Sequence, residues 1–440
     1  MSDSIDVARL IDSRPVSRFQ WQVLATCMAV SFLDGLNLQT IGVAAPALAA
    51  LWGIARQALG PVFAAAPAGM ILGALLMGPI ADRIGRKRLV VMATVTFGLF
   101  SLLTPLATTL HQLLIFRLLT GLGLGGALPN LISLITEYSP APKRGFLTAL
   151  TFSSLPFGSM LAGLVGPWMI PAFGWQSVFY FSGAAPVLVA VIALLWLPES
   201  IRYLANHPER RAEVLVILRR IAPDIIVDSE APLILSGPPV ARRILVSRVF
   251  GPTRTSATLT LALIVGLNLF MINLLVNWLP TLLGEAGMSR RGAILSTAVL
   301  NVMGAIGGIA WGSLLDRFGM YRIMGLAALA SGVAMVGLAF GHTNPTVMFL
   351  TLSIVGLSVM GTQPGFYTLI ASVYPTSIRS TGVGTSLGIG RLGSVFGPAL
   401  GGMLVAAGLG AQGIFLVVAC AGILCSLAVW VLSRLRPQFS

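Results

Sequence analysis

Three charged side chains lie inside stretches of sequence that are otherwise apolar enough to cross a membrane. Asp34 lies in FLDGLNLQT (residues 32–40), Arg117 in RLLTGLGLGG (117–126) and Arg391 in GRLGSVFGP (390–398). On insertion scales, a charge at the centre of a spanning helix costs about 2.5–3.5 kcal/mol, so such residues have a partner, a function or both. These three residues are therefore the first candidates for chemistry.

An acid and an arginine in a medium of low dielectric constant suggest proton-coupled handling of an anion. Burial favours the neutral form of Asp34, whereas a nearby guanidinium favours its carboxylate, so this residue could exchange a proton near neutral pH. Arg391 does not deprotonate, and its planar fork fits a carboxylate. A substrate anion would compete with Asp34 for this cation, so protonation and anion binding would favour each other. Asn37, one turn beyond Asp34 on the same helical face, could hydrogen-bond either partner.

The segments that carry these residues are predicted to be membrane helices. Of the 440 residues, 56% are hydrophobic and 10% are charged, against roughly 25% charged in soluble domains. A spanning helix needs about 20 apolar residues. Twelve apolar segments approach or exceed this length, near 20–50, 57–81, 89–110, 112–137, 145–170, 176–198, 256–283, 292–315, 322–341, 344–371, 382–407 and 411–434. The polar opening has no short apolar core before a cleavage site, so we expect no removable signal peptide.

The net charge of +14 could indicate a nucleic-acid partner, but the distribution of the charges indicates membrane topology instead. Of the 28 Lys and Arg residues, 23 lie on one predicted side, and only Arg56, Arg290 and Arg291 lie on the other. The positive-inside rule then places both termini in the cytoplasm, with the chain in the cell inner membrane. We expect contact with anionic lipid and no nucleic-acid partner.

The two halves of the chain repeat each other. GPIADRIGRKR (78–88) corresponds to GSLLDRFGMYR (312–322), RLLTGLGLGGALPN (117–130) to LSIVGLSVMGTQPG (352–365), and the GLNL of 35–38 to that of 266–269. Secondary transporters are often built from two such six-helix halves, with the substrate site between them. The predicted organisation is an N-terminal tail (1–19), an N-terminal bundle (20–198), a central loop (199–255), a C-terminal bundle (256–434) and a C-terminal tail (435–440).

The three intramembrane charges are not repeated. The repeat aligns Asp34 with Val265, Arg117 with Leu352 and Arg391 with Pro156. A charge needed only for packing would be expected in both halves. Its presence in one half favours a function, and we expect partial pairing of these charges across the interface between the halves.

These motifs resemble those of the major facilitator superfamily. GPIADRIGRKR is similar to its cytoplasmic loop signature and RLLTGLGLGG to its fourth-helix motif; DGLNLQTIGVAAPAL (34–48), NWLP (277–280) and YPTSIRSTGVG (374–384) resemble its aromatic acid:proton symporters. The resemblance covers nearly the whole chain. It implies an all-α integral membrane protein with the major facilitator fold, in which 12 transmembrane helices form two pseudo-symmetric six-helix bundles and transport proceeds by alternating access.

The resemblance also implies roles for individual residues. The family carries Asp-Gly-x-Asp in its first helix; here Asp34 occupies the first acidic position, as the proton-coupling residue, and Asn37, which cannot ionise, occupies the second. GLNLQ looks more like the carriers of hydroxyphenylpropionate-type acids than the hydroxybenzoate carriers. The fourth- and eleventh-helix arginines of the family match Arg117 and Arg391. An aromatic acid needs an apolar slot with a few polar anchors, which adds residues of helices seven and ten to the predicted substrate set: Asp34, Asn37, Arg391, Arg117, Gln363, Trp278, Phe366 and Tyr367.

The loop signature predicts a second set of residues, for conformational gating. A carboxylate such as Asp82 interacts favourably with a helix N-terminus, here one from the opposite half. Such contacts would hold the outward-open state and break when the cytoplasmic side opens, although the same charges could simply set topology. The predicted set is Gly78, Asp82, Arg83, Gly85, Arg86, Glu137, Arg144, Asp316, Arg317 and Arg379.

The predicted function is import of a small aromatic carboxylate, of the hydroxybenzoate or hydroxyphenylpropionate type, by proton symport. A monomer is expected, with the proton gradient as energy source and no cofactor. A transporter of another organic acid, a drug or metabolite efflux antiporter and a non-transporting membrane sensor are the alternatives. GPWMIP (166–171) lacks the paired glycines of efflux antiporters. An enzyme is not expected, because we find no nucleophile–base set, and neither the three Cys nor the three His have metal-ligand spacing.

Overall fold

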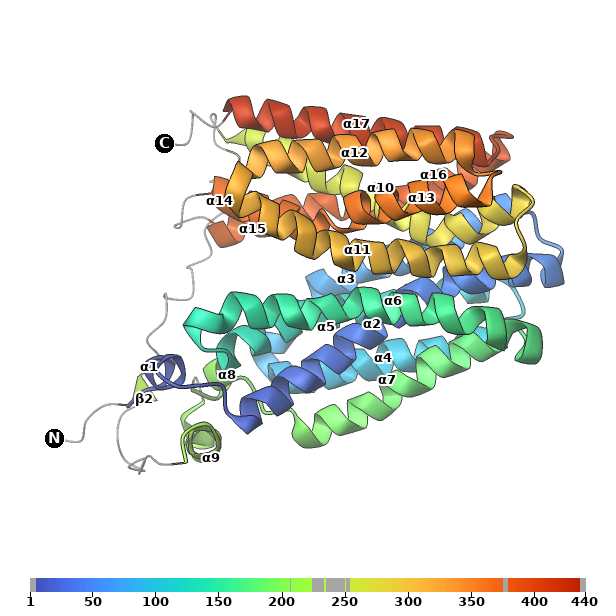
Figure 1. Ribbon diagram of the computed structural model, residues 1–440. Helices are drawn as coiled ribbons and strands as arrows, with labels where there is room; N and C mark the ends of the chain where they lie inside the picture. Colours follow the sequence, from blue (N-terminus) through green and yellow to red (C-terminus); the bar gives the residue numbers. More distant parts are fainter. Residues whose placement is uncertain are drawn as a thin grey trace.

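The computed structural model describes residues 5–205, 207–223, 233–234, 250, 254–374 and 379–435. Twelve helices in this part of the chain are long and apolar enough to cross a membrane, which confirms the predicted all-α fold. They form two bundles that lie side by side, the N-terminal one blue to green and the C-terminal one yellow to red (Figure 1). We call the side on which α2 begins and α17 ends the terminal side.

The N-terminal bundle contains six uninterrupted helices. They are α2 (Arg18–Trp52), α3 (Leu59–Ile84), α4 (Arg86–Leu103), α5 (Leu110–Tyr138), α6 (Arg144–Phe173) and α7 (Gln176–Trp196), with short 3₁₀ turns η1 (Arg56–Ala58), η2 (Thr104–Leu106) and η3 (Ala141–Lys143). The start of α2 is a capping box, because Ser17 Oγ accepts from Gln20 N at 3.3 Å and Gln20 Oε1 accepts from Ser17 N at 2.7 Å. The helix ends at Gly53, in the left-handed region with φ 60°.

The C-terminal bundle differs in that two of its six spans are interrupted. Its continuous helices are α10 (Thr255–Glu285), α11 (Arg290–Phe318), α12 (Met320–Gly341) and α17 (Ala411–Leu435); the tenth span is α13 (Pro345–Val355), the π-helical η6 (Gly356–Met360) and α14 (Gln363–Val373), and the eleventh is α15 (Arg379–Gly390) followed by α16 (Leu392–Ala406). The sequence predicted continuous helices there. Glycines at 384, 388, 390 and 393 weaken helix propensity around the second break without lowering its apolar character.

Short elements cover the terminal side of the N-terminal bundle. They are α1 (Val7–Asp12), α8 (Ile201–Ala205), η4 (Pro208–Arg210), α9 (Arg211–Ile221) and a parallel pair of two-residue strands, β1 (Ile5–Asp6) and β2 (Leu233–Ile234). Val7 and Ile11 belong to the same buried cluster as the apolar face of α9. Asp12 fastens α1 to the bundle, because its Oδ1 accepts from Ala141 N at 2.7 Å.

The internal repeat is visible in the packing. A Cβ on Gly158 would lie 1.7 Å from Phe32 O, and a Cβ on Gly393, its counterpart in the second half, would lie 1.9 Å from Gly266 O. The first and fifth helices of each half therefore pack backbone against backbone, and at both positions only glycine allows the approach.

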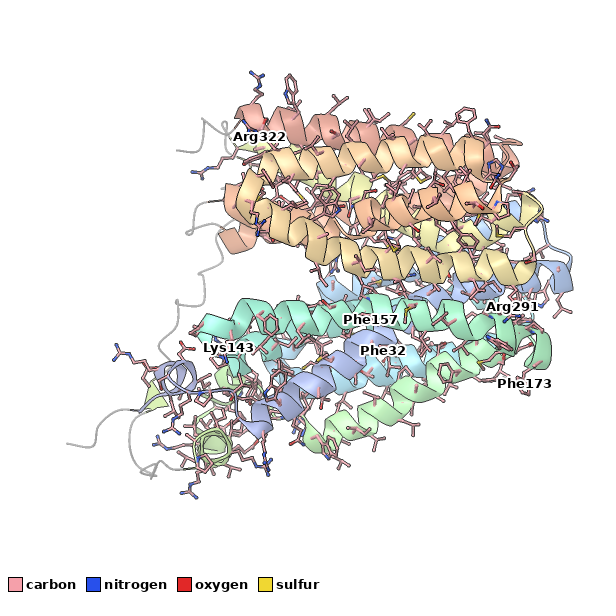
Figure 2. The ribbon with its side chains drawn as sticks, viewed as in Figure 1. Phe32, Lys143, Phe157, Phe173, Arg291 and Arg322 are labelled. Carbon is pink, nitrogen blue, oxygen red and sulfur yellow. The ribbon has the colours of Figure 1, made fainter. Side chains whose placement is uncertain are left out.

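The two bundles share one core on the side opposite the termini and have separate cores on the terminal side. The shared core joins Ile41 and Phe63 of the first half to Trp278 and Leu282 of the second, whereas the other two clusters each contain residues of a single half. In Figure 2 the shared end carries Arg291, whose guanidinium lies 4.4 Å from the Trp168 ring, and Lys143 lies at the other end. The structure is therefore a conformer closed on the side opposite the termini.

Candidate functional site

Asp34 lies in the middle of α2 with no hydrogen-bond partner in the described part of the chain. The residue is 1% exposed, and neither of its carboxylate oxygens is satisfied. Arg391 of the other bundle interacts with it electrostatically. Burying an ionised carboxylate without a hydrogen-bond partner costs free energy. The electrostatic attraction of Arg391 offsets part of this cost.

Arg391 occupies the break between α15 and α16. Its backbone N bonds Leu387 O at 2.9 Å, and its carbonyl accepts from Ser394 N at 3.0 Å and from Ser394 Oγ at 2.6 Å. The side chain is partly exposed. From this position Arg391 interacts electrostatically with Asp34 of the other bundle, and these are two of the three charges that the sequence singled out.

Two further predicted residues accompany Arg391 in the C-terminal bundle. Gln363 Nε2 donates to the Tyr367 hydroxyl at 2.9 Å, one turn along α14, and Arg391 interacts electrostatically with Tyr367. The π-helical η6 precedes Gln363. Asn268 bridges this irregular stretch, because its Nδ2 donates to Val359 O at 2.9 Å and to Thr362 Oγ1 at 3.3 Å. Irregular backbone inside a membrane needs such partners.

Arg117 forms a second polar cluster, within the N-terminal bundle. It is 0% exposed, its Nη1 donates to Asn37 Oδ1 at 3.4 Å, and its guanidinium lies 5.9 Å from the Phe179 ring centre. Asn37 in turn donates to Ser182 O at 3.0 Å. The Nε and Nη2 of Arg117 have no hydrogen-bond partner in the described residues, and both atoms are enclosed by protein in this conformer. The structure thus pairs Arg117 inside its own half, whereas the sequence suggested pairing across the interface.

Trp278 and Phe366, both predicted to contact substrate, have their surfaces covered by protein in this conformer. Trp278 is 0% exposed, packs edge-on against Phe63 at 5.1 Å and donates from Nε1 to Pro398 O at 3.0 Å. Phe366 is 1% exposed and belongs to the core of the C-terminal bundle. Arg391 thus interacts electrostatically with Asp34 and with Tyr367, whose hydroxyl accepts from Gln363, whereas Asn37 and Arg117 bond to each other within the N-terminal bundle.

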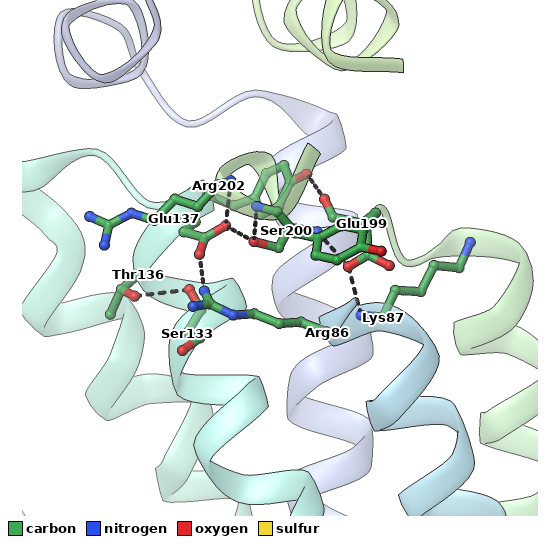
Figure 3. A network of polar contacts seen from close by, with 10 residues as sticks. Arg86, Lys87, Ser133, Thr136, Glu137, Glu199, Ser200 and Arg202 are labelled. Atoms are coloured by element: carbon green, nitrogen blue, oxygen red, sulfur yellow. Dashed lines mark hydrogen bonds and ion pairs between the residues drawn. The ribbon is translucent and has the colours of Figure 1, made fainter. Parts of the chain in front are cut away.

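Among the predicted gating residues whose side chains the structure describes, the hydrogen bonds and ion pairs given below all stay within one bundle and the short elements that cover it. Arg86 forms an ion pair with Glu137, and Glu137 Oε2 accepts from Ser200 Oγ at 2.7 Å (Figure 3). Arg144 donates to Ser139 O at 3.3 Å and lies 3.7 Å from Asp12. Arg83 and Arg317 are exposed, Gly78 has open space at its Cβ position and Gly85 has a φ of +98°. The side chains of Asp82, Asp316 and Arg379 lie outside the described part.

Two sets of polar contacts were not predicted from the sequence. Glu199 accepts from Lys87 N at 3.0 Å and from Ser200 N at 2.8 Å, and so caps the start of α4. The sequence feature that could have indicated this cap is an acidic residue directly after the sixth apolar segment. On the opposite side, Gln39 Nε2 donates to Val276 O at 3.0 Å and Arg56 pairs with Glu285, both across the halves. The sequence offered a signal for each contact. Gln39 is a polar residue in an apolar helix, and Arg56 is one of the few cations on its side of the membrane.

Comparison with known proteins gives a consistent picture. The Major Facilitator Superfamily model matches residues 27–384 and 261–439. The 4-hydroxybenzoate transporter PcaK of Pseudomonas putida is 37% identical over 92% of this chain and 90% of its own length. The 3-(3-hydroxy-phenyl)propionate transporter of Escherichia coli is 33% identical over 94% of this chain and 95% of its own. An inward-open structure of the xylose transporter XylE from E. coli superposes with a TM-score of 0.75 at 18% identity, over 96% of this chain and 100% of that one.

Proposed function

Because the chain belongs to the major facilitator superfamily, we propose that it imports a small aromatic carboxylate together with protons. It is a multi-pass membrane transporter and not an enzyme, since its family and fold are those of transporters. The observation that carries the proposal is the buried carboxylate of Asp34, which has no hydrogen-bond partner among the described residues and interacts electrostatically with Arg391 of the other bundle. Relatives that carry 4-hydroxybenzoate and 3-(3-hydroxy-phenyl)propionate support the substrate class.

The proposed coupling is a competition for Arg391. With Asp34 ionised, the guanidinium is held by the acid; when Asp34 takes up a proton, the fork of Arg391 becomes free to bind the substrate carboxylate in two parallel hydrogen bonds. We assign Gln363 and the Tyr367 hydroxyl, which are hydrogen-bonded to each other, to the binding of a ring substituent. Loss of the proton to the other side restores the attraction between Asp34 and Arg391 and expels the anion.

The orientation follows from the distribution of positive charge. We place the chain in the inner membrane with both termini in the cytoplasm, so the conformer described here faces inward. Alternating access then consists of opening the shared core on the outer side while the terminal side closes. A single proton with a monoanion moves no net charge, so the pH gradient alone would drive uptake, whereas a second proton would add about 2.3 kcal/mol per 100 mV of membrane potential.

Uptake into proteoliposomes tests the proposal. Radiolabelled 4-hydroxybenzoate and 3-(3-hydroxyphenyl)propionate are offered with an imposed pH gradient, acid outside, and D-xylose serves as the control substrate. We expect accumulation of at least one aromatic acid with the gradient, none of xylose, and little effect of a potential set with valinomycin. Equal uptake with and without the gradient would contradict proton coupling, and absence of uptake for every aromatic acid tested would contradict the substrate class.

A further inference from the structure

One hydrogen bond between the bundles ends on a backbone carbonyl that a proline leaves without its usual helical partner. In an α-helix the carbonyl of residue i accepts from the N–H of residue i+4, and proline has no N–H. Pro280 lies inside α10, so it cannot donate to the carbonyl of Val276. Gln39 of α2, in the other bundle, donates from Nε2 to this carbonyl at 3.0 Å. A side chain of one bundle therefore completes the backbone of the other.

Glycine at position 42 allows the two helices to approach closely at this bond. A Cβ on Gly42, one turn beyond Gln39 on the same face of α2, would lie 2.5 Å from Val276 O. Gln39 is 0% exposed, and Ile41 belongs to the core that the two bundles share. Gln39 lies five residues beyond Asp34, which is about 7.5 Å of helix. The bond is therefore part of the closed interface, between Asp34 and the end of α2 that lies opposite the termini.

This bond can exist only while the two bundles are in contact. Without the amide of Gln39, the carbonyl of Val276 would be a buried acceptor that lacks a donor, which costs free energy in the closed conformer. When the bundles separate on this side, water can reach the carbonyl and replace the bond. The Gln39 amide therefore stabilises the closed conformer relative to the open one.

We propose that Gln39 is a gating residue, which holds the side opposite the termini closed by donating to the carbonyl that Pro280 leaves without a helical partner. The inference rests on the alternating access of the proposed function. Opening of that side breaks the bond, and closing restores it. Gln39 Oε1 has no hydrogen-bond partner among the described residues; this buried oxygen disfavours the same conformer, so the two ends of the amide act in opposite directions.

The N-terminal bundle contains the same arrangement within a single bundle. Pro186 inside α7 cannot donate to Ser182 O, and Asn37 Nδ2 donates to that carbonyl at 3.0 Å. Both partners move together when one bundle moves against the other as a rigid body. This second bond therefore contributes to the stability of its bundle and not to the balance of conformers, which makes it the matched control.

A double-mutant cycle isolates the proposed contact from the other effects of each substitution. Gln39→Met removes the amide at similar side-chain length, and Pro280→Ala restores a helical N–H for Val276 O. The unsatisfied Oε1 is lost in both backgrounds, so its effect cancels. Pro280→Ser, which also restores the N–H, replaces Pro280→Ala if that variant does not fold. Asn37→Leu and Pro186→Ala form the control cycle, in which the bond of Asn37 to Arg117 cancels likewise.

Electron-resonance distances report the ratio of open to closed conformers. The labels are placed at Thr108→Cys and Thr343→Cys, two exposed positions on the side opposite the termini, one in each half. The exposed Cys420 is replaced by Ser. The distances are measured without substrate and without a pH gradient. Failure to take up aromatic acids would therefore contradict the proposed function and leave this measurement unaffected.

We expect Gln39→Met to raise the ratio of open to closed conformers about threefold to tenfold more in the parent than in the Pro280→Ala background. The control cycle should show no such difference. Equal shifts in the two Gln39 backgrounds, or no shift in either, overturn the proposal. A difference of the same size in the control cycle overturns it too, because the effect is then not specific to a contact between the bundles.

Discussion

Asp34 and Asn37 lie one turn apart on the same face of α2, yet they have opposite surroundings. Both oxygens of Asp34 lack partners, whereas Asn37 accepts from Arg117 and donates to Ser182 O at 3.0 Å. The residue free to change its protonation is thus the acid, and the amide holds the neighbouring arginine in place. We therefore propose the single ionisable group of the pair as the proton carrier.

Asp34→Asn tests that role. The amide cannot carry a proton, so we expect accumulation driven by a pH gradient to fall at least tenfold, whereas exchange of labelled for unlabelled substrate continues because Arg391 remains available. Both rates are measured in the same proteoliposomes, and exchange serves as the control for folding. A variant that accumulates substrate as the parent does would remove Asp34 from the proton path.

Asn37→Asp and Asn268→Asp form a matched pair, because the two asparagines occupy equivalent positions in the repeated GLNL stretch. The first places a carboxylate beside Arg117 and also sets one of its oxygens against Ser182 O. Hydrogen bonds to charged groups contribute about 1.5–3 kcal/mol and neutral ones about 0.5–1.5 kcal/mol, so we expect the gain at Arg117 to exceed the loss at Ser182 and the melting temperature to rise. The second places a carboxylate against Val359 O and Thr362 Oγ1, so we expect a lower one. Thermal unfolding in detergent measures both, and shifts of the same sign would contradict the pairing of Arg117 with position 37.

At the scale of single residues, the sequence identified the charges inside the apolar segments but did not indicate how the aromatic side chains are packed. A charge inside an apolar segment is conspicuous, which is why Asp34, Arg117 and Arg391 could be found. An aromatic side chain can face lipid, pack in a core or line a binding site. The residue types therefore did not reveal that Trp278 packs against Phe63 or that Phe366 is buried in the core of the C-terminal bundle.

At the scale of elements, the two glycines of the loop signature have different structural requirements. Gly85 joins α3 to α4 with a φ of +98°, and a Cβ there would lie 2.3 Å from Glu199 Oε2. Gly78, inside α3, has no atom within 4 Å of its Cβ position. The local fold therefore requires glycine at position 85. At position 78 the described structure gives no steric reason for glycine.

Gly85→Ala and Gly78→Ala separate these demands. A backbone conformation that only glycine adopts costs about 1–3 kcal/mol for other residues, so Gly85→Ala should lower the melting temperature. Gly78→Ala should raise the melting temperature slightly, because alanine is more favourable than glycine in a helix interior by about 0.8–1.0 kcal/mol. If the terminal side closes over this position, the same variant should slow transport. Normal transport by Gly78→Ala would contradict its assignment to gating.

Elements were predicted well where hydropathy defines them and poorly where it does not. The twelve spans were visible as apolar runs separated by polar loops. The interruptions at Gly356–Met360 and at Arg391 were not, because glycine-rich sequence stays apolar whether or not the helix continues. The cap that Glu199 places on α4 depends on a contact between residues 112 positions apart, which periodicity does not reveal.

At the scale of the whole molecule, the closed side is held by one large core and by polar contacts at its edge. Arg56 and Glu285 connect the bundles there, with side chains 53% and 22% exposed. An ion pair this accessible to water is worth roughly 0.2–1 kcal/mol. The duplication in the sequence predicted two bundles, but not which side is closed, because conformers of a transporter differ by only a few kcal/mol.

Glu285→Arg tests this contact as a conformational latch. Two cations then face each other, so we expect the outward-open population to rise roughly twofold to fivefold, and the exchanged pair Arg56→Glu with Glu285→Arg to restore it. Electron-resonance distances between labels at Thr108→Cys and Thr343→Cys, in a Cys420→Ser background, report the population. If the exchanged pair behaves like the single variant, the effect is not electrostatic.

The two halves share a sequence pattern but not the continuity of one helix. In the first half α5 runs unbroken from Leu110 to Tyr138, whereas its counterpart changes to π-helical turns at Gly356–Met360 before α14 begins. Amide protons at such a break are less well protected, because the opening of a few bonds there disturbs no continuous ladder. Deuterium should therefore enter the 356–362 stretch sooner than residues 121–127, so that two bundles descended from one pattern would differ in how readily they bend.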